Sequence, residues 1–174
     1  MAYTTPITAV TGVVATASDW NSGVRDNFAV MGPHLVARKT SDTSRSSTTA
    51  TVDSTVAMPV AANEVWQFEF SLLAFSAGGT SIKVSFDGPT GCSFHVTTVF
   101  ADSGGTITST SWNDITGPEI ELALSSTTRP DHFSIPGVFD NGGTAGNLSL
   151  KWGCVVAASV TLVTNTSLWA ARLV

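Results

Sequence analysis

The stretch "EVWQFEFSLLAF", residues 64–75, decides the fold class. Large apolar residues alternate in it with polar ones: Trp66, Phe68, Phe70 and Leu72 against Gln67, Glu69 and Ser71. Successive side chains of a β-strand point to opposite faces, so a period of two is typical of a strand with one buried and one exposed face. The stretch therefore predicts a half-buried strand that opens a β-domain.

The same alternation returns along the rest of the chain. It involves Ile82, Val84 and Phe86 before the turn at residues 87–89, and Cys92, Phe94 and Val96 after it. Six further segments are also predicted strands: "GTITSTSW", "PEIELALS", "DHFSIPGVF", "GNLSLKWGCVVA", "SVTLVTNT" and "SLWAARLV". Short strands separated by Gly- and Asn-containing turns are typical of antiparallel sandwiches, and we expect one of jelly-roll type. No fixed repeat period and no second domain is evident.

One part of the chain departs from this pattern. The segment "ATASDWNSGVRDNFAVMGP", residues 15–33, begins with a candidate N-cap, Thr16, and has Asp19 in the capping-box position. Its apolar residues recur at helical spacing: Trp20, Val24, Phe28 and Met31. Gly32-Pro33 ends the run, since proline cannot continue a helix. We expect a short amphipathic helix here, preceded by an extended arm.

This helix is expected to be marginal on its own. Gly23 costs it about 1 kcal/mol relative to alanine, and short isolated helices fray in water. Its apolar face, with Arg25 and Asp26 beside it, is therefore the candidate attachment site. The alternative is that this face packs under the body of its own subunit.

The composition suggests three parts in the chain. Residues 1–39 form the arm and attachment helix, and residues 56–174 form the β-sandwich head. Between them lies "TSDTSRSSTTATVDST", residues 40–55, which has almost no apolar side chains. We expect this stretch to be a polar linker or an exposed edge segment.

The overall charge excludes several classes of function. Charged residues make up 12% of the 174 residues, and the formal net charge is −5. The few basic residues are scattered, so we expect no nucleic-acid partner. The longest apolar run, residues 154–163, is shorter than the ~20 residues that span a bilayer, and no secretory signal is evident, so we expect no membrane anchor. A weakly charged surface suits a subunit packed against other subunits.

The candidate catalytic and metal-binding groups do not form a set. Ser103 in "ADSGGT" would need a histidine base, but His34, His95 and His132 lie in no catalytic or metal-ligand spacing. A carboxylate pair among Glu69, Glu119 and Glu121 would depend on the fold. Cys92 and Cys154 are expected to be buried thiols. We therefore expect no cofactor, no metal and no enzymatic activity.

The tryptophans are the remaining candidates for ligand contact. Trp66, Trp152 and Trp169 alternate with small or polar residues in predicted strands, which favours the core or a subunit interface. Trp112 lies at a strand end beside Asn113 and Asp114 and is the candidate ligand contact.

Two segments resemble those of a known family. The N-terminal one resembles a segment near the start of many tailed-bacteriophage virion proteins, with matching residues Gly12, Thr16, Ala17, Asp19, Trp20, Asn21, Val24, Arg25, Asp26 and Asn27. The C-terminal one is similar to the closing strands of trimeric phage jelly-roll domains, with Leu148, Leu150, Trp152, Leu168, Ala171, Arg172 and Leu173 in matching places. The resemblance implies a homotrimeric head, likened to the tumour-necrosis-factor fold, carried on the virion by its N-terminal segment.

Three functions follow as hypotheses. The first is a capsid decoration, or cement, subunit that assembles in the bacterial host cytoplasm and contacts itself and the major capsid protein or tail proteins. The second is a tail-associated fibre or knob that binds host surface glycans through Trp112 and the turns near Asp102 and Asn141. The third is an enzyme acting on cell-wall polymer, for which no residue set can be assembled from the sequence.

Overall fold

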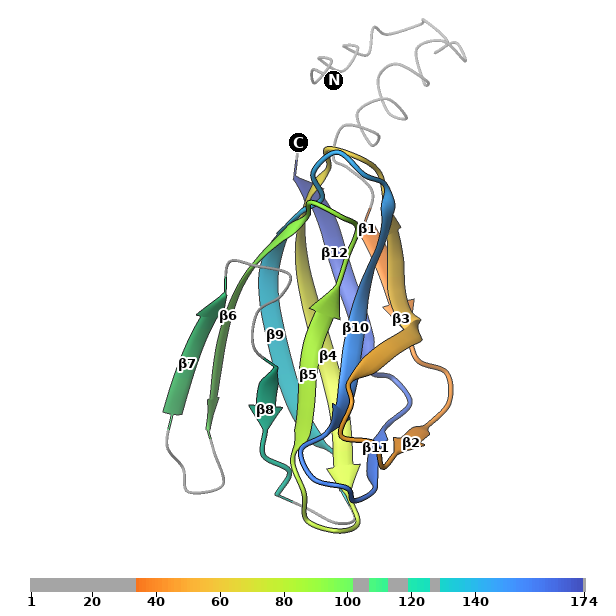
Figure 1. The fold of residues 1–174 in the computed structure, drawn as a ribbon, viewed down its shortest axis with the longest axis vertical. Coiled ribbons are helices and arrows are strands. Elements are labelled where there is room, and N and C mark those ends of the chain that lie inside the picture. Colours follow the sequence, from red (N-terminus) through yellow and green to blue (C-terminus); the bar gives the residue numbers. More distant parts are fainter. Residues whose placement is uncertain (1–33, 102–106, 113–118, 126–128, 174) are drawn as a thin grey trace, which may run out of the picture.

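The chain forms two antiparallel β-sheets packed face to face (Figure 1). The computed structural model describes residues 34–101, 107–112, 119–125 and 129–173. The small sheet has the strand order β3 (Thr51–Val60), β10 (Gly146–Cys154), β5 (Ile82–Asp87) and β8 (Ile120–Leu122). This confirms the prediction of an antiparallel β-sandwich.

The large sheet contains eight strands. Its main path is β1 (His34–Arg38), β12 (Ser167–Leu173), β4 (Val65–Ser76), β9 (Asp131–Asp140), β6 (Ser93–Ala101) and β7 (Ile107–Trp112). A short strand, β11 (Val160–Leu162), pairs with the end of β4 and with β2 (Thr43–Arg45). The described residues contain no helix, and hence none long and apolar enough to cross a membrane.

The strand connections are those of a jelly roll. Four antiparallel pairs are nested along the chain: β3 with β10, β4 with β9, β5 with β8, and β6 with β7. The chain rolls these pairs up so that β3, β10, β5 and β8 form one sheet while β4, β9, β6 and β7 form the other. β1, β12, β11 and β2 then extend the second sheet beyond β4, where the chain enters the sandwich.

The core forms where the inward-facing residues of the two sheets meet. Trp66, Phe68, Phe70 and Leu72 are each at most 2% exposed, as their alternation predicts. Five phenylalanines form a continuous run of ring contacts with centroids 4.9 to 6.2 Å apart: Phe68, Phe70, Phe86, Phe94 and Phe139. Cys92 and Cys154 are buried thiols that form no disulfide, as expected.

The sandwich begins earlier in the chain than the composition suggests. His34–Arg38 forms β1, at the edge of the large sheet. The polar stretch at 40–55 contributes β2 and the first half of β3, the edge strand of the small sheet. β1 is short and packs only Leu35 and Ala37 against the core, and the buried position in the first half of β3 is the polar Asp53, so neither segment shows a long apolar alternation.

Candidate functional site

The predicted attachment residues lie outside the described residues: Trp20, Val24, Phe28, Met31, Arg25 and Asp26. The predicted helix and arm therefore remain predictions. For Trp112 the structure gives only the backbone, which ends β7 opposite Val96. Two places in the described part bear on function: the junction at which the N-terminal segment joins the sandwich, and the outer face of the large sheet.

The junction is held first by backbone hydrogen bonds. β1 pairs with β12 along its whole length, from His34 opposite Ala171 to Arg38 opposite Ser167. Just beyond β1, the amide of Lys39 donates to the carbonyl of Thr166 at 2.8 Å, and the amide of Asn165 donates to the carbonyl of Lys39 at 3.0 Å. The chain that follows residue 33 is thus fixed to the C-terminal strand at once.

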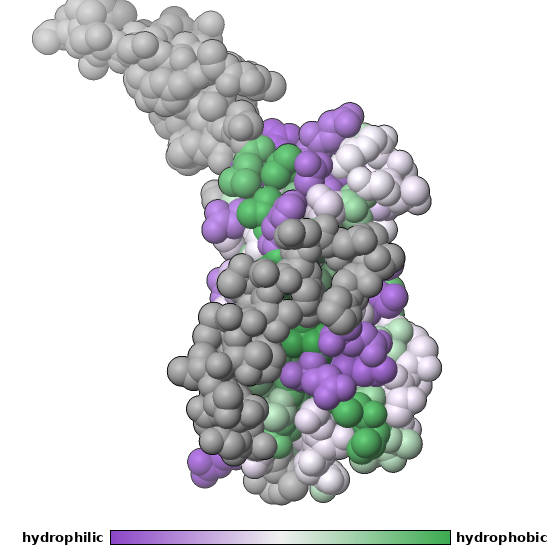
Figure 2. Space-filling model, turned by 60° about the vertical axis from the view of Figure 1, so that its left-hand side comes forward, coloured by the Kyte–Doolittle hydropathy of each residue, from purple (hydrophilic) through white to green (hydrophobic). Residues whose placement is uncertain are grey.

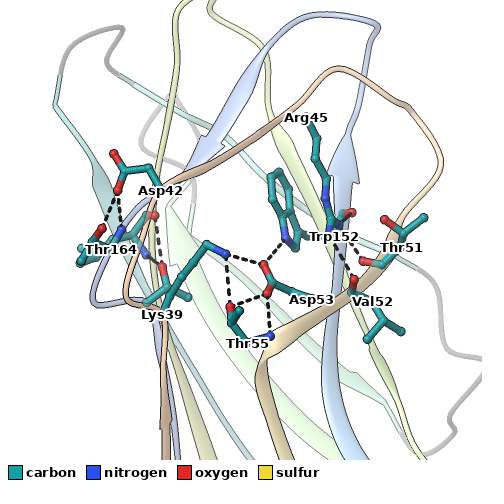
Figure 3. A network of polar contacts seen from close by, with 11 residues as sticks. Lys39, Asp42, Arg45, Thr51, Val52, Asp53, Thr55, Trp152 and Thr164 are labelled. Carbon is teal, nitrogen blue, oxygen red and sulfur yellow. Dashed lines mark hydrogen bonds and ion pairs between the residues drawn. The ribbon is translucent and has the colours of Figure 1, made fainter.

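A buried ion pair then ties this junction to the opposite sheet (Figure 3). Lys39 Nζ lies 2.9 Å from Asp53 Oδ2, and the two side chains are 2% and 4% exposed. Lys39 follows β1 of the large sheet, whereas Asp53 belongs to β3 of the small sheet. We call this pair, with Thr55 and Trp152, the junction clamp, because it joins the two sheets at their common edge.

The partners of the clamp satisfy the buried charges. Lys39 Nζ also donates to Thr55 Oγ1 at 3.3 Å. Asp53 accepts hydrogen bonds from Trp152 Nε1 at 3.1 Å, from the Thr55 amide at 3.1 Å and from the Thr55 hydroxyl at 2.6 Å. A buried ion pair is tolerated only where such additional hydrogen bonds replace water, and here they do.

Two further contacts brace the segment between β1 and β3. The guanidinium of Arg45 lies 4.2 Å from the ring centre of Trp152 and donates to the carbonyls of Trp152 and Thr51, both at 2.7 Å. Asp42 accepts hydrogen bonds from the amide and the hydroxyl of Thr164 at 2.8 and 2.7 Å. The polar residues of the stretch expected to be a linker or an edge segment therefore hold the edge of the sandwich together.

The clamp predicts an acid-sensitive contribution to stability. Burial opposes ionisation of Asp53, but hydrogen bonds from Thr55, Lys39 and Trp152 outweigh it and hold the pKa of Asp53 at about 2, below its ordinary value of 3.8. A lowered pKa means that the contribution, about 2 kcal/mol, is present above pH 4 and is lost as the pH falls toward 2. Urea unfolding at pH 5 and pH 2.5 measures it, with Asp53→Asn as reference.

We expect the difference in unfolding free energy between the wild type and Asp53→Asn to shrink as the pH falls from 5 to 2.5. The reference is needed because Asp42 and Glu64, whose pKa values are also lowered, contribute to acid sensitivity in both proteins. A difference that stays constant with pH would contradict the assignment to Asp53.

The outer face of the large sheet carries an exposed tryptophan among polar side chains. Trp169 on β12 is 39% exposed and lies between Val36 of β1, 67% exposed, and Glu69 of β4. Ser134 of β9 donates its hydroxyl to Glu69 Oε1 at 2.7 Å. Ser71 Oγ and His132 Nε2 share a hydrogen bond of 2.8 Å. We call Trp169, Glu69, Gln67, Ser71, Ser134 and His132 the outer strip.

The tryptophans divide between two environments. Trp66 and Trp152 are 2% and 0% exposed. They are core residues, which is one of the two environments expected for them, the other being a subunit interface. Trp169 is instead a surface residue of the large sheet. Its alternation with the buried Leu168 and Ala170 is the signal that could have placed it on the outer face, but its neighbours there depend on the pairing of β12 with β4, which the sequence does not show.

The three candidate carboxylates do not form a pair in the described residues, and only His132 of the candidate histidines lies on the same strip as Glu69. Glu69 lies on the outer face of the large sheet, whereas Glu119 and Glu121 belong to the β8 region of the small sheet, where Glu119 pairs with Lys83 at 2.6 Å. His95 is exposed on β6, and Ser103 lies outside the described part. Within that part, no group of three or more His, Cys, Asp or Glu residues could hold a metal ion.

Similarities to solved structures are distant. The xylan-binding CBM22-1 domain of Paenibacillus barcinonensis Xyn10C is 12% identical, with a TM-score of 0.36 over 81% of this chain and 95% of that domain. The tripod (BppUct-A-L) from the baseplate of bacteriophage Tuc2009 is 8% identical, with a TM-score of 0.35 over 98% of this chain and 79% of that one.

The VP2 subviral particle of infectious bursal disease virus is 11% identical, with a TM-score of 0.20 over 80% of this chain and 40% of that one. No protein-family model and no curated protein matches the sequence. Similarities at this level do not assign a function, which must rest on the residues themselves.

Proposed function

We propose that this chain is a non-enzymatic structural subunit of a tailed-bacteriophage virion, a decoration or cement protein that binds the assembled capsid through its N-terminal segment. The observation that carries the proposal is that the candidate attachment segment is followed directly by a junction that many hydrogen bonds and a buried ion pair hold in place. The amphipathic pattern of Trp20, Val24, Phe28 and Met31 ends only a few residues before β1. β1 is in turn fixed to both sheets by β12 and the junction clamp.

The proposed mechanism is binding without turnover. A subunit that binds the assembled shell but not its free components stabilises the shell by its free energy of binding. A firm junction serves this purpose, because binding of the segment then places the whole jelly roll against the shell. We further propose that the head assembles as a homotrimer like those of the tumour-necrosis-factor fold, with the major capsid protein or tail proteins as its other partners.

A second candidate is a tail-associated fibre or knob that binds host surface glycans. The observation that favours it is the outer strip, in which an exposed indole lies beside a carboxylate and hydroxyl groups. The sequence predicts the same role for Trp112, and for that residue the role remains a prediction. Both candidates place the protein in the virion.

The position and copy number of the protein on purified particles distinguish the two candidates. We expect many copies distributed over the capsid surface, visible by electron microscopy of particles labelled through a tag at the C-terminus. A few copies confined to the tail would support the second candidate instead. Particles that carry no copies would overturn both.

A further inference from the structure

The outer strip combines an exposed indole with polar side chains on one face of the large sheet. Trp169 and Glu69 are directly opposite each other on β12 and β4, so their Cβ atoms lie about 5 Å apart. The residues two positions before and after Trp169 on the same face are small, Ser167 and Ala171. No long side chain of β12 therefore covers the indole from either of these two positions.

The polar members of the strip form two ordered pairs. The hydroxyl of Ser134 holds one oxygen of Glu69 at 2.7 Å, and a carboxylate has lone pairs for further donors. Ser71 and His132 form the second pair at 2.8 Å, on the same two strands, β4 and β9. Gln67, opposite Ala171, adds an amide that both donates and accepts. Regular strands hold all these groups, so little order has to be gained on binding.

From this arrangement we propose that the outer strip binds a neutral polysaccharide, with a sugar ring stacked on Trp169 and its hydroxyl groups bonded to Glu69, Gln67 and the Ser134 and Ser71 hydroxyls. A sugar has an apolar C–H face and a rim of hydroxyls that both donate and accept. An indole next to a carboxylate, an amide and hydroxyls matches both features.

The charge of the strip selects against other occupants. The carboxylate of Glu69 in its centre, on a protein with a formal net charge of −5, repels an anionic polymer. A second copy of the chain would bring a second Glu69 into the interface and bury two carboxylates, which is costly unless each gains a cation such as Arg38, exposed on the same face opposite Ser167. On the face that Figure 2 shows, both hydrophilic and hydrophobic areas are present among the described residues.

This inference deepens the second candidate function by naming its ligand class and site. It is tested on the free protein, without virions. Failure to bind sugar would therefore leave attachment through the N-terminal segment untouched, and failure of attachment would leave sugar binding untouched.

The test is affinity electrophoresis of the full chain in gels that contain dextran, mannan, xylan or mixed-linkage β-glucan, with hyaluronan as an anionic control. We expect at least one neutral polymer to retard the wild type and hyaluronan not to. Trp169→Ala should weaken the binding about tenfold or more, and Glu69→Gln should weaken it less. Val36→Ala, the neighbour of Trp169 on β1, is the matched control and should bind like the wild type.

Three results would overturn the proposal: no retardation by any of the four neutral polymers, retardation that Trp169→Ala leaves unchanged, or self-association of the wild type that Trp169→Ala abolishes. Thermal unfolding of each variant shows that it is folded. Trp169 is on the surface, so we expect the variants to melt near the wild type.

Discussion

Replacing Asp53 with alanine is expected to lower the free energy of unfolding by about 3–5 kcal/mol. The change removes the carboxylate that faces Lys39 at 2.9 Å and leaves an ammonium group, 2% exposed, without its counter-charge. It also removes the acceptor for Trp152 Nε1, a buried donor. Urea unfolding at pH 7 measures the loss, which is large compared with the total stability of a small domain.

A double variant separates the charge from the hydrogen bonds. Lys39→Met with Asp53→Asn removes both charges together, while the single asparagine oxygen can still accept either from Trp152 or from Thr55, which bond different oxygens of Asp53. We therefore expect the double variant to be clearly more stable than Asp53→Ala. An Asp53→Ala protein within about 1 kcal/mol of the wild type would show that the junction clamp is not a structural tie.

The strands of the sandwich could be predicted from the sequence because their signal is local. In β4, β5 and β10, apolar residues alternate with polar ones wherever one face of the strand meets the core. The turn residues between them separate the nine predicted strands, which correspond to β4 through β12. The sheet to which each strand belongs does not follow from local sequence, because β3 pairs with β10 across almost a hundred residues. The structure nevertheless confirms the predicted jelly-roll type.

The edge of the sandwich could not be predicted in the same way. The inward-facing position in the first half of β3 is Asp53, and its partner Lys39 precedes it by 14 residues in a stretch rich in Ser and Thr. Hydrophobic periodicity cannot detect a buried position that is filled by a paired charge. The pairing of β1 with β12 likewise joins residues about 130 positions apart, and the local pattern of neither strand indicates which strand it pairs with.

Deleting residues 1–32 is expected to abolish incorporation of the protein into virions while the head stays folded. The described residues contain the whole jelly roll, its aromatic core and the junction clamp, and all of these lie after residue 33. The deletion removes Trp20, Val24, Phe28 and Met31, the proposed contacts with the shell. Loss of an entire docking segment costs most of the binding energy, because a few apolar and aromatic anchors usually carry it.

A smaller change tests the apolar face by itself. Trp20→Ser combined with Phe28→Ser should reduce incorporation nearly as much as the deletion. Ser22→Ala lies in the same predicted helix but away from its apolar face, and it should be incorporated like the wild type. Equal incorporation of both variants would show that the apolar face is not what binds.

The amount of the deletion protein found in particles is the most direct test of attachment through the N-terminal segment. Particles are purified from hosts that supply either the full chain or residues 33–174, and the bound copies are counted by quantitative mass spectrometry. We predict full occupancy for the complete chain and background levels for the truncated one, with circular dichroism showing that the truncated head is folded. Normal incorporation of a folded head that lacks residues 1–32 would contradict the proposed mode of attachment.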